Sequence, residues 1–392
     1  PSANHSRPPN THKSTYPADL TPTPSPLQPA CAARDCLKMR KPALHPNHSL
    51  HAFPTIIQES DLSQIKDIIV HTWAESTKES YGSGLLVFHV FCDTKSIPDS
   101  DHTPVSSDLI SFFISSLAGQ YSGGTVANYL QGIRMWHIMH RLGWSHNDMK
   151  IEALLKAAIR LTPTSSKCKP REPYTVNILG LMHDNLDLVD PADTAVFACL
   201  TTTFWCTTRV GEFTVPRLDA FNPSLHVKPS NVTHEKDRQG VMVTNFRLPR
   251  TKSALLGEDV SWAQQHGPSD PQVALQNHFN MNNPPMDGHL FAYKHKGGHR
   301  PLTKSKFNSS LSSAAKRAGI KPLQGHDVRI GSTLEYLLRN VPFDVIKIKG
   351  HWVSDAFLVY LRCHAQILAP YIQASPPLHE GFLRYTMPPI CH

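Results

Sequence analysis

Residues 325–340 read GHDVRIGSTLEYLLRN, and residues 349–362 read KGHWVSDAFLVYLR. The first stretch predicts a helix over residues 326–339, because its apolar side chains recur at helical spacing. His326 and Arg329 are three residues apart near the start of that helix, so both project from one face. His351 comes later in the chain, directly after Gly350, and Tyr360 lies nine residues beyond it. These stretches combine cationic side chains with one phenol.

Two stretches upstream carry further cations. Residues 207–213 read TTRVGEF, and residues 248–253 read LPRTKS. Burying an unpaired Arg is costly, so Arg209 either forms a structural pair with Glu212 or binds an anion. Lys252 follows a β-prone run, which places it at the tip of a hairpin, either as a solvated residue or as a functional one.

Helical spacing dominates the rest of the chain. The pattern predicts five helices between residues 61 and 161, which would form a small bundle. A second region is expected to be mostly helical around a small antiparallel sheet. Its expected helices are 174–188, 191–206, 210–216, 303–318, 326–339, 343–348 and 354–362, and its expected strands are 240–248 and 290–293. The fold class is therefore mainly α.

Composition divides the chain further. Residues 1–54 hold 11 of the 33 Pro, and such a segment buries too little surface to offset its ordering entropy. We expect a disordered Pro-rich tail there, with Lys38, Arg40 and Lys41 as a short basic nuclear-import patch. The expected parts are a tail 1–54, a helical domain 55–161, a basic linker 162–173, a second domain 174–373 and a flexible tail 374–392. The chain starts with Pro1, which indicates a fragment or a processed chain.

Charge points to an anionic partner. Lys and Arg number 39 against 31 Asp and Glu, a net charge of +8. Residues 288–326 contain eight Lys or Arg and no acid, which favours a polyanion surface over an ordinary solvated face. No apolar run is long enough to span a membrane, so no membrane partner is expected.

Cysteine and histidine usage favours no metal site. The eight Cys are scattered and form no CxxC pair, and the 24 His form no HExxH. Cys92, Cys199 and Cys206 lie in apolar runs and are expected to be core residues, which favours a reduced, intracellular chain. The sequence also lacks the phosphate loop of NTPases and a carboxylate cluster of the kind that two-metal nucleases need.

Taken together and in this order, the motifs resemble those of the tyrosine recombinases, the phage-integrase-like site-specific recombinases. Arg209 with Glu212, the hairpin Lys252, the His-x-x-Arg box of His326 and Arg329, His351 after a Gly, and Tyr360 all match. The resemblance covers about residues 61–371. The residue usage, rich in His and poor in Cys, is similar to that of recombinases of fungal Crypton-like mobile elements. It implies that residues 55–161 form a DNA core-binding domain and residues 174–373 a catalytic domain.

The resemblance implies a function and roles. The chain would be a DNA strand transferase in which Tyr360 forms a covalent 3′-phosphotyrosine, with no metal or cofactor. Arg209, Arg329 and His351 would bind the phosphate, Lys252 would protonate the leaving oxygen, and His326 would ease deprotonation of the phenol. Glu212 would orient His326 or an Arg, and Trp352 would pack beneath the site or replace His351.

DNA contacts and assembly are also expected. The candidate phosphate-binding residues are Arg134, Lys167, Lys169, Arg171, Lys294, Lys296, Arg300, Lys304 and Lys306. Double-stranded DNA would be the partner, with a homo-tetramer on synapsed DNA and a monomer in solution, in the nucleus of a eukaryote or otherwise in the cytoplasm. Two alternatives stay open, namely a catalytically silent, domesticated DNA-binding protein of the same fold and a topoisomerase-like DNA-relaxing enzyme.

Overall fold

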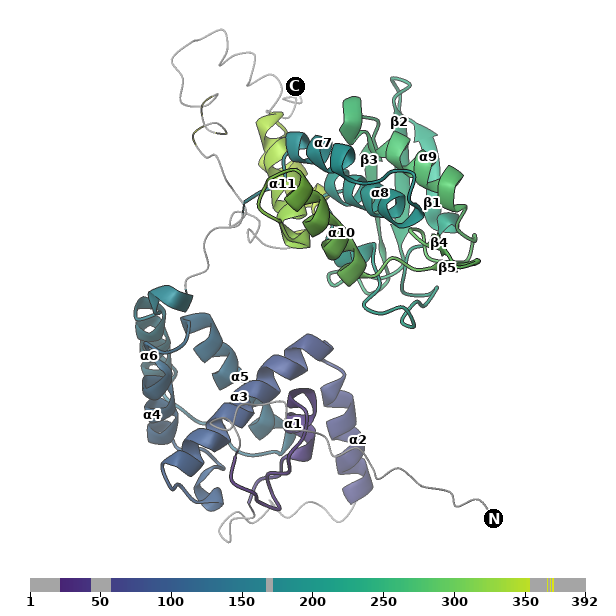
Figure 1. Cartoon of the computed structure of the whole chain (residues 1–392). Coiled ribbons are helices and arrows are strands. Elements are labelled where there is room, and N and C mark those ends of the chain that lie inside the picture. Colours follow the sequence, from purple (N-terminus) through teal and green to yellow (C-terminus); the bar gives the residue numbers. More distant parts are fainter. Residues whose placement is uncertain are drawn as a thin grey trace, which may run out of the picture. The chain divides into compact units, whose positions relative to one another are not determined.

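The computed structural model describes residues 22–43, 58–166 and 172–352, together with Ala365, Ile367 and Ala369. The chain divides into two compact units, Pro1–Lys169 (unit 1) and Pro170–His392 (unit 2). Helices make up most of the described elements (Figure 1), and every described strand pairs antiparallel. The prediction of a mainly helical chain with a small antiparallel sheet is therefore confirmed.

Unit 1 is a helical bundle. Its α-helices are α1 (Ala33–Met39), α2 (Glu59–Val70), α3 (Glu75–Thr94), α4 (Ser107–Leu117), α5 (Gly123–Met139) and α6 (Asp148–Arg160). Side-chain oxygens of Ser106 and Ser122 accept hydrogen bonds from the first turns of α4 and α5, which satisfies backbone donors that have no helical partner. Phe88, Phe113 and Trp136 are fully buried at the centre. The five helices expected between residues 61 and 161 are confirmed.

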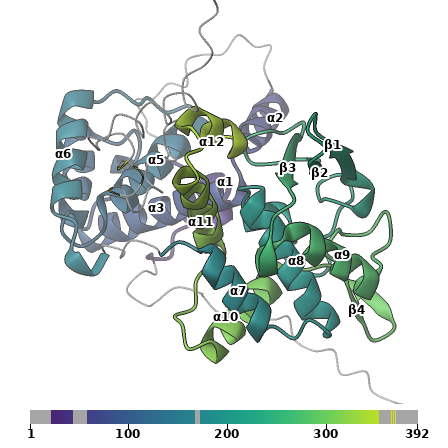
Figure 2. The same ribbon diagram turned by 90° about the horizontal axis from the view of Figure 1, so that it is seen from above.

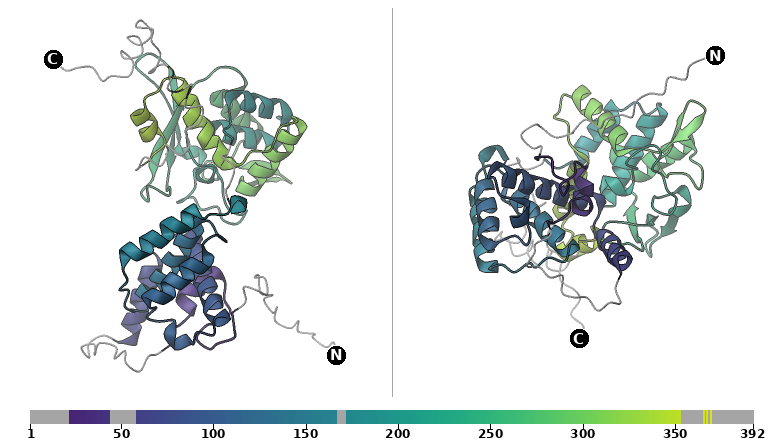
Figure 3. Two further views of the ribbon diagram at one scale, coloured as in Figure 1. Left: turned by 90° about the vertical axis from the view of Figure 1, so that its left-hand side faces the viewer. Right: turned by 90° about the horizontal axis from the view of Figure 1, so that it is seen from below.

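One helix of unit 1 comes from the segment that was expected to be a disordered tail. In α1, Cys36 and Leu37 are buried in the bundle core, and α1 contacts α3 and α5. The left view of Figure 3 shows the purple α1 among the blue helices. A side chain at Gly82 of α3 would overlap the carbonyl of Ala33, so the two helices approach at backbone distance. The prediction of a tail over residues 1–54 is therefore wrong for residues 22–43.

Arg40 follows α1 and is 1% exposed. Its Nη1 lies 2.6 Å from Nδ1 of His89, and its carbonyl oxygen accepts a hydrogen bond from Nε1 of Trp136 at 2.9 Å. Lys38 pairs with Asp67 of α2 at 2.6 Å. One of the three cations of the expected nuclear-import patch is therefore inside the bundle, whereas Lys38 and Lys41 are exposed.

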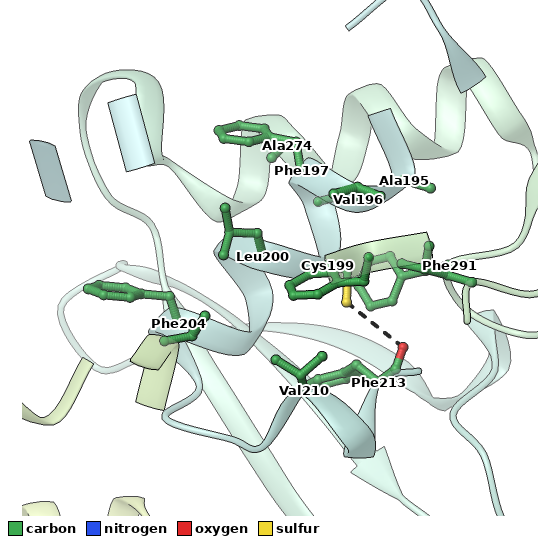
Figure 4. Close-up of a cluster of buried hydrophobic side chains, with 14 of the residues drawn as sticks. Ala195, Val196, Phe197, Cys199, Leu200, Phe204, Val210, Phe213, Ala274 and Phe291 are labelled. Atoms are coloured by element: carbon green, nitrogen blue, oxygen red, sulfur yellow. Dashed lines mark hydrogen bonds between the residues drawn. The ribbon is translucent and has the colours of Figure 1, made fainter. Parts of the chain in front are cut away.

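Unit 2 is built around a buried helix. The α-helices are α7 (Val176–Asn185), α8 (Pro191–Trp205), α9 (Pro271–Asn282), α10 (Lys304–Arg317), α11 (Gly325–Leu338) and α12 (Phe343–Lys349). Thirteen of the fifteen residues of α8 are buried, so apolar neighbours cover it on all sides. Figure 4 shows Cys199 and Leu200 of α8 among Phe213, Ala274 and Phe291 from later segments. Cys199 and Cys206 here, and Cys92 of unit 1, are core residues as predicted.

The strands of unit 2 form two small sheets. Strands β1 (Val232–Lys236), β2 (Met242–Leu248) and β3 (Glu258–Ala263) make a meander, and β4 (Tyr293–His295) pairs with β5 (Gly298–Arg300). The inward side chains of Phe246 and Trp262 pack on the helices at alternate strand positions, while β1 is mostly exposed. The β2–β3 connection spans residues 249–257 and contains Lys252.

Helices α11 and α12 complete unit 2 and contact each other (Figure 2 shows them one above the other). Leu334, Leu337 and Ile346 pack together with Ile367, one of the described residues near the C-terminus. In the part of the chain that the structure describes, no helix combines the length and apolarity needed to cross a membrane. The expected linker 162–173 is described only in part, and the tail 374–392 lies outside the described residues.

Candidate active site

Arg209 stands at the turn that follows α8. Thr207 takes a left-handed backbone conformation, with φ 58°, and the short helix η4 (Val210–Glu212) comes next. Glu212 receives two hydrogen bonds from Arg209, one from the backbone nitrogen at 2.9 Å and one from Nη1 at 2.7 Å. The Glu212 side chain is 10% exposed and that of Arg209 is 36% exposed. The guanidinium is thus oriented by Glu212 and still open to an anion.

The start of α11 lies directly against this turn. A Cβ atom on Gly325 would lie 2.9 Å from Cγ2 of Val210, so only glycine lets the two segments meet this closely. His326 is half-buried and Arg329 is 2% exposed, one turn further along α11. The Arg209 turn and the His-x-x-Arg box therefore lie next to each other.

Arg329 in turn contacts the segment after α12. Its Nη2 donates a hydrogen bond to the carbonyl oxygen of Gly350. Its Cζ lies 4.4 Å from the centroid of the Trp352 ring, a cation–π contact. A side chain at Gly350 would overlap that ring, so glycine is required there. Trp352 therefore packs against the guanidinium and fixes its plane.

His351 projects from the same segment. Its backbone is left-handed, with φ 52°, and its Nδ1 lies 2.7 Å from Oε2 of Glu258. The two side chains are 30% and 14% exposed. Glu258 begins β3 and so ends the loop that carries Lys252. Glu258 was not among the residues predicted from the sequence, because the partner of His351 is set only by folding.

Lys252 itself lies on an exposed turn. The turn is closed by a hydrogen bond from the nitrogen of Thr251 to the carbonyl oxygen of Ala254, at 2.9 Å. Lys252 thus belongs to a loop whose far end reaches His351 through Glu258. Tyr360 lies outside the described residues, as do Lys167, Lys169 and Arg171.

A half-buried lysine links the end of α12 to β3. Nζ of Lys349 donates to the carbonyl oxygen of Ser261 in β3 at 2.9 Å and lies 5.0 Å from the Tyr336 ring centroid. Burial lowers the pKa of this ammonium. Tyr336 is a core residue, since its hydroxyl donates to the carbonyl oxygen of Trp205 at 2.8 Å and burial raises its pKa. Its phenol is therefore engaged in packing.

The predicted basic surface forms a distinct patch on unit 2. Lys294, Lys296 and Arg300 are exposed on the β4–β5 hairpin, and Lys304 is exposed at the start of α10, with Lys306 half-buried. Desolvation, followed by the charges of Arg300 and Lys296, lowers the pKa of His295. The name hairpin patch is used below for the four exposed cations Lys294, Lys296, Arg300 and Lys304. Arg134 is exposed on α5 of unit 1.

No described set of three His, Cys, Asp or Glu side chains gathers closely enough to hold a metal ion. Arg209, Arg329 and His351 lie on segments that contact one another in turn, and each side chain is held by a named partner. Three hydrogen-bond donors on three adjacent segments suit an anion rather than a cation. Such an arrangement can bind the oxygens of one phosphate.

Comparison with known proteins gives matches at the level of structure. No family model matches the chain, and no curated protein matches it. XerA recombinase is 14% identical over 80% of this chain and 98% of its own, with a TM-score of 0.36. The XerH site-specific recombinase bound to palindromic difH substrate, in a post-cleavage complex, is 14% identical over 77% of this chain and 80% of its own, with a TM-score of 0.48.

A lambda integrase dimer bound to a COC′ core site is similar as well. It is 13% identical over 76% of this chain and 75% of its own, with a TM-score of 0.40. Recombinases and an integrase are thus among the solved structures that this chain resembles. At these identities and TM-scores, the chain's own residues carry the inference about function.

Proposed function

We propose that the chain is a DNA strand transferase that cuts and rejoins duplex DNA through a covalent 3′-phosphotyrosine at Tyr360. The observation that carries this proposal is the adjacency of three segments. The turn of Arg209 lies against the start of α11, Arg329 of α11 binds the Gly350 carbonyl, and His351 follows Gly350 directly. The order of the motifs along the sequence adds Lys252, His326 and Tyr360 to the proposed site.

The chemistry suits these side chains. A phosphodiester is anionic and repels nucleophiles, and its transition state gathers charge on the non-bridging oxygens. Arg209 and Arg329 would bind those oxygens through their planar, permanently charged guanidinium groups. His351 would donate a third hydrogen bond. Loss of one such donor is expected to lower the cleavage rate by about 10²–10³-fold.

Arg209 and Arg329 would engage the phosphate differently. Arg209 is partly exposed and already oriented by Glu212, so it can bind DNA without rearrangement. Arg329 is covered and bonded to the Gly350 carbonyl. Its side chain would have to shift toward the phosphate when DNA binds. Assembly of the full site would thus depend on substrate.

Proton transfer completes the reaction. A tyrosine ordinarily has a pKa near 10, so Tyr360 would lose its proton with help from His326 or the guanidinium pair. The phenolate oxygen would attack phosphorus and the 5′-oxygen would leave, which conserves bond energy for rejoining. Lys252, on its exposed loop, would give the leaving oxygen its proton.

The test is a covalent trap. In a duplex library that is nicked within a randomised stretch, cleavage releases the short fragment that carries the free 5′-hydroxyl. Rejoining is then impossible, so a covalent adduct accumulates on the unmutated chain. Tyr360→Phe is expected to bind DNA and form no adduct, while Tyr371→Phe, the matched control, keeps the adduct. An adduct that survives Tyr360→Phe would overturn the assignment.

The other functions predict other results. Salt-sensitive binding without an adduct from the unmutated chain indicates a silent DNA-binding protein. Relaxation of supercoiled plasmid by a monomer without a specific site indicates a topoisomerase-like enzyme. We propose that recombination proceeds in a tetramer on two duplexes, which light scattering of the trapped complex would detect.

Lys252 has a separate chemical test. A sulfur leaving atom at the 5′ bridging position needs no proton, because a thiolate leaves readily. Lys252→Ala is therefore expected to cleave the sulfur substrate at nearly the unmutated rate and the oxygen substrate far more slowly. Equal slowing on both substrates would place the proton donor elsewhere.

A further inference from the structure

Strand β3 holds the end of α12 at two points. Oε2 of Glu258 lies 2.7 Å from Nδ1 of His351, and the carbonyl oxygen of Ser261 accepts a hydrogen bond from Lys349 at 2.9 Å. Gly350, between these two side chains, accepts the hydrogen bond from Arg329. The sheet therefore sets where the His351 segment lies relative to α11.

Glu258 has a single described ionic partner, His351. Its neighbour Asp259 faces Arg247 of β2, 3.3 Å away, and both of those side chains are well exposed. The Glu258 side chain is 14% exposed and that of His351 is 30% exposed, so water has limited access to the carboxylate. A carboxylate at one ring nitrogen of a histidine orients the ring and keeps that nitrogen protonated.

The same residue closes the Lys252 loop. Glu258 stands opposite Leu248 as the first pair of the β2–β3 ladder. The nitrogen of the preceding Gly257 donates to the carbonyl oxygen of Ala254 at 3.2 Å, and Ala254 in turn closes the Thr251 turn. A short chain of hydrogen bonds thus joins the turn of Lys252 to the partner of His351.

We propose that Glu258 is a positioning residue that accepts a hydrogen bond from Nδ1–H of His351 and orients the ring, so that the doubly protonated imidazole donates from Nε2–H to a phosphate oxygen. The inference rests on the proposed function for its role in cleavage. The pairing of Glu258 with His351 does not depend on DNA, because the ion pair is present in the protein alone. Glu258 also fixes the base of the loop that presents Lys252.

The pairing is tested by nitrogen NMR of the full chain with labelled histidine. The His351 ring signal is identified by its loss in His351→Gln. We expect Nδ1 to be protonated in the unmutated chain and to lose this preference in Glu258→Ala. Asp259→Ala, which alters the adjacent exposed carboxylate, is the matched control and should leave the signal unchanged. An unchanged ring signal in Glu258→Ala would overturn the proposal.

The role in cleavage is tested by trapped-adduct kinetics. Glu258→Ala is expected to lower the cleavage rate by about 10–100-fold with little change in DNA affinity. The double variant Glu258→Ala/His351→Gln should be no slower than His351→Gln alone, because the carboxylate acts through the ring. Additive losses would overturn the positioning role. An inactive unmutated chain would refute the proposed function, while the NMR result would still decide the pairing.

Discussion

The carbonyl group of Tyr174 occupies the space that a side chain on Gly331 would need. A Cβ atom there would overlap the carbonyl oxygen and lie 2.7 Å from both the carbonyl carbon and the nitrogen of Tyr174. The nitrogen of Tyr174 also donates to the carbonyl oxygen of Asp327 at 3.2 Å. The segment that enters unit 2 is therefore in backbone contact with α11, which carries His326 and Arg329.

Gly331→Ala should therefore destabilise unit 2. Overpacking against backbone atoms that cannot rotate away is expected to cost about 1–3 kcal/mol, measured by urea unfolding. Gly180→Ala in α7 is the matched control, because a Cβ there meets open space and alanine favours a helix by about 1 kcal/mol. Equal stability of the two variants would contradict the close contact.

Unit 1 should lose stability in mild acid. Burial lowers the pKa of His137 and of His140 to about 4, and burial followed by the charge of Arg40 lowers that of His89. The unfolded chain takes up protons near pH 6.5 while these folded rings stay neutral. Stability is thus full above pH 6.5 and falls toward pH 4, by up to about 1.4 kcal/mol per pH unit for each histidine.

Hydrogen exchange of α3 and α5 peptides at pH 7 and pH 5, corrected for intrinsic rates, measures this loss. The Nδ1 of His137 donates to the carbonyl oxygen of Ile133 at 2.9 Å, and its Nε2 accepts from the nitrogen of Val105 at 3.0 Å, so the ring must be neutral. His137→Gln should reduce the pH dependence by about one proton. His71→Gln, at an exposed position of unit 1, should leave it unchanged.

Cys31 should be the most reactive of the described thiols. Its Sγ lies 3.4 Å from that of Cys36, and this hydrogen bond, helped by the charge of Arg40, lowers its pKa to about 7. Burial raises the pKa of Cys92 and of Cys206 to about 12. Iodoacetamide should therefore modify Cys31 first, with a rate that rises with pH and levels off above about pH 7.

Peptide mapping by mass spectrometry gives the order of modification. Cys36→Ala removes the hydrogen-bond donor and should move the midpoint of the Cys31 rate profile toward the ordinary thiol value near 8.5. Modification of Cys31 no faster than that of Cys92 would contradict a thiolate at this position.

The hairpin patch should govern the salt dependence of DNA binding. If Lys296 neutralises one phosphate, Lys296→Ala reduces the slope of log affinity against log salt by about 0.9 and weakens binding to all duplexes alike. Fluorescence anisotropy between 50 and 200 mM salt measures this slope. Lys156, already paired with Glu152 at 2.7 Å, is the control, and Lys156→Ala should leave the slope unchanged. An unchanged slope for Lys296→Ala would show that Lys296 does not contact a DNA phosphate.

Helical periodicity predicted most of the helices, since α3 to α6, α10 and α11 bury apolar faces at regular spacing. The helix α8 was predicted as well, although it is buried on nearly all sides. It missed α9, whose start is marked by Asp270 and Pro271 but whose sequence is largely polar. It also missed β1, four of whose five residues are exposed. The expected helix at 210–216 is only the short η4, and the strand expected over 290–293 starts at Tyr293.

The candidate site could be predicted where a motif is local. Arg209 and Glu212 form their predicted contact because three residues separate them on one short turn. The pairing of His351 with Glu258 could not be predicted, since it depends on how β3 packs against the end of α12. The same holds for Trp352 on Arg329. Tertiary packing, rather than sequence spacing, selects these partners.

The burial of α1 has a practical consequence for work on unit 1. A shortened polypeptide that starts at residue 58, where proline content falls and helical periodicity begins, would lack α1, whose backbone lies against Gly82, and Arg40, whose carbonyl oxygen accepts a hydrogen bond from Trp136. Such a fragment would leave the buried ring of His89 without its Arg40 contact and expose core side chains of the bundle, so it should precipitate on expression. Fragments meant to bind DNA through this bundle need to begin ahead of residue 22.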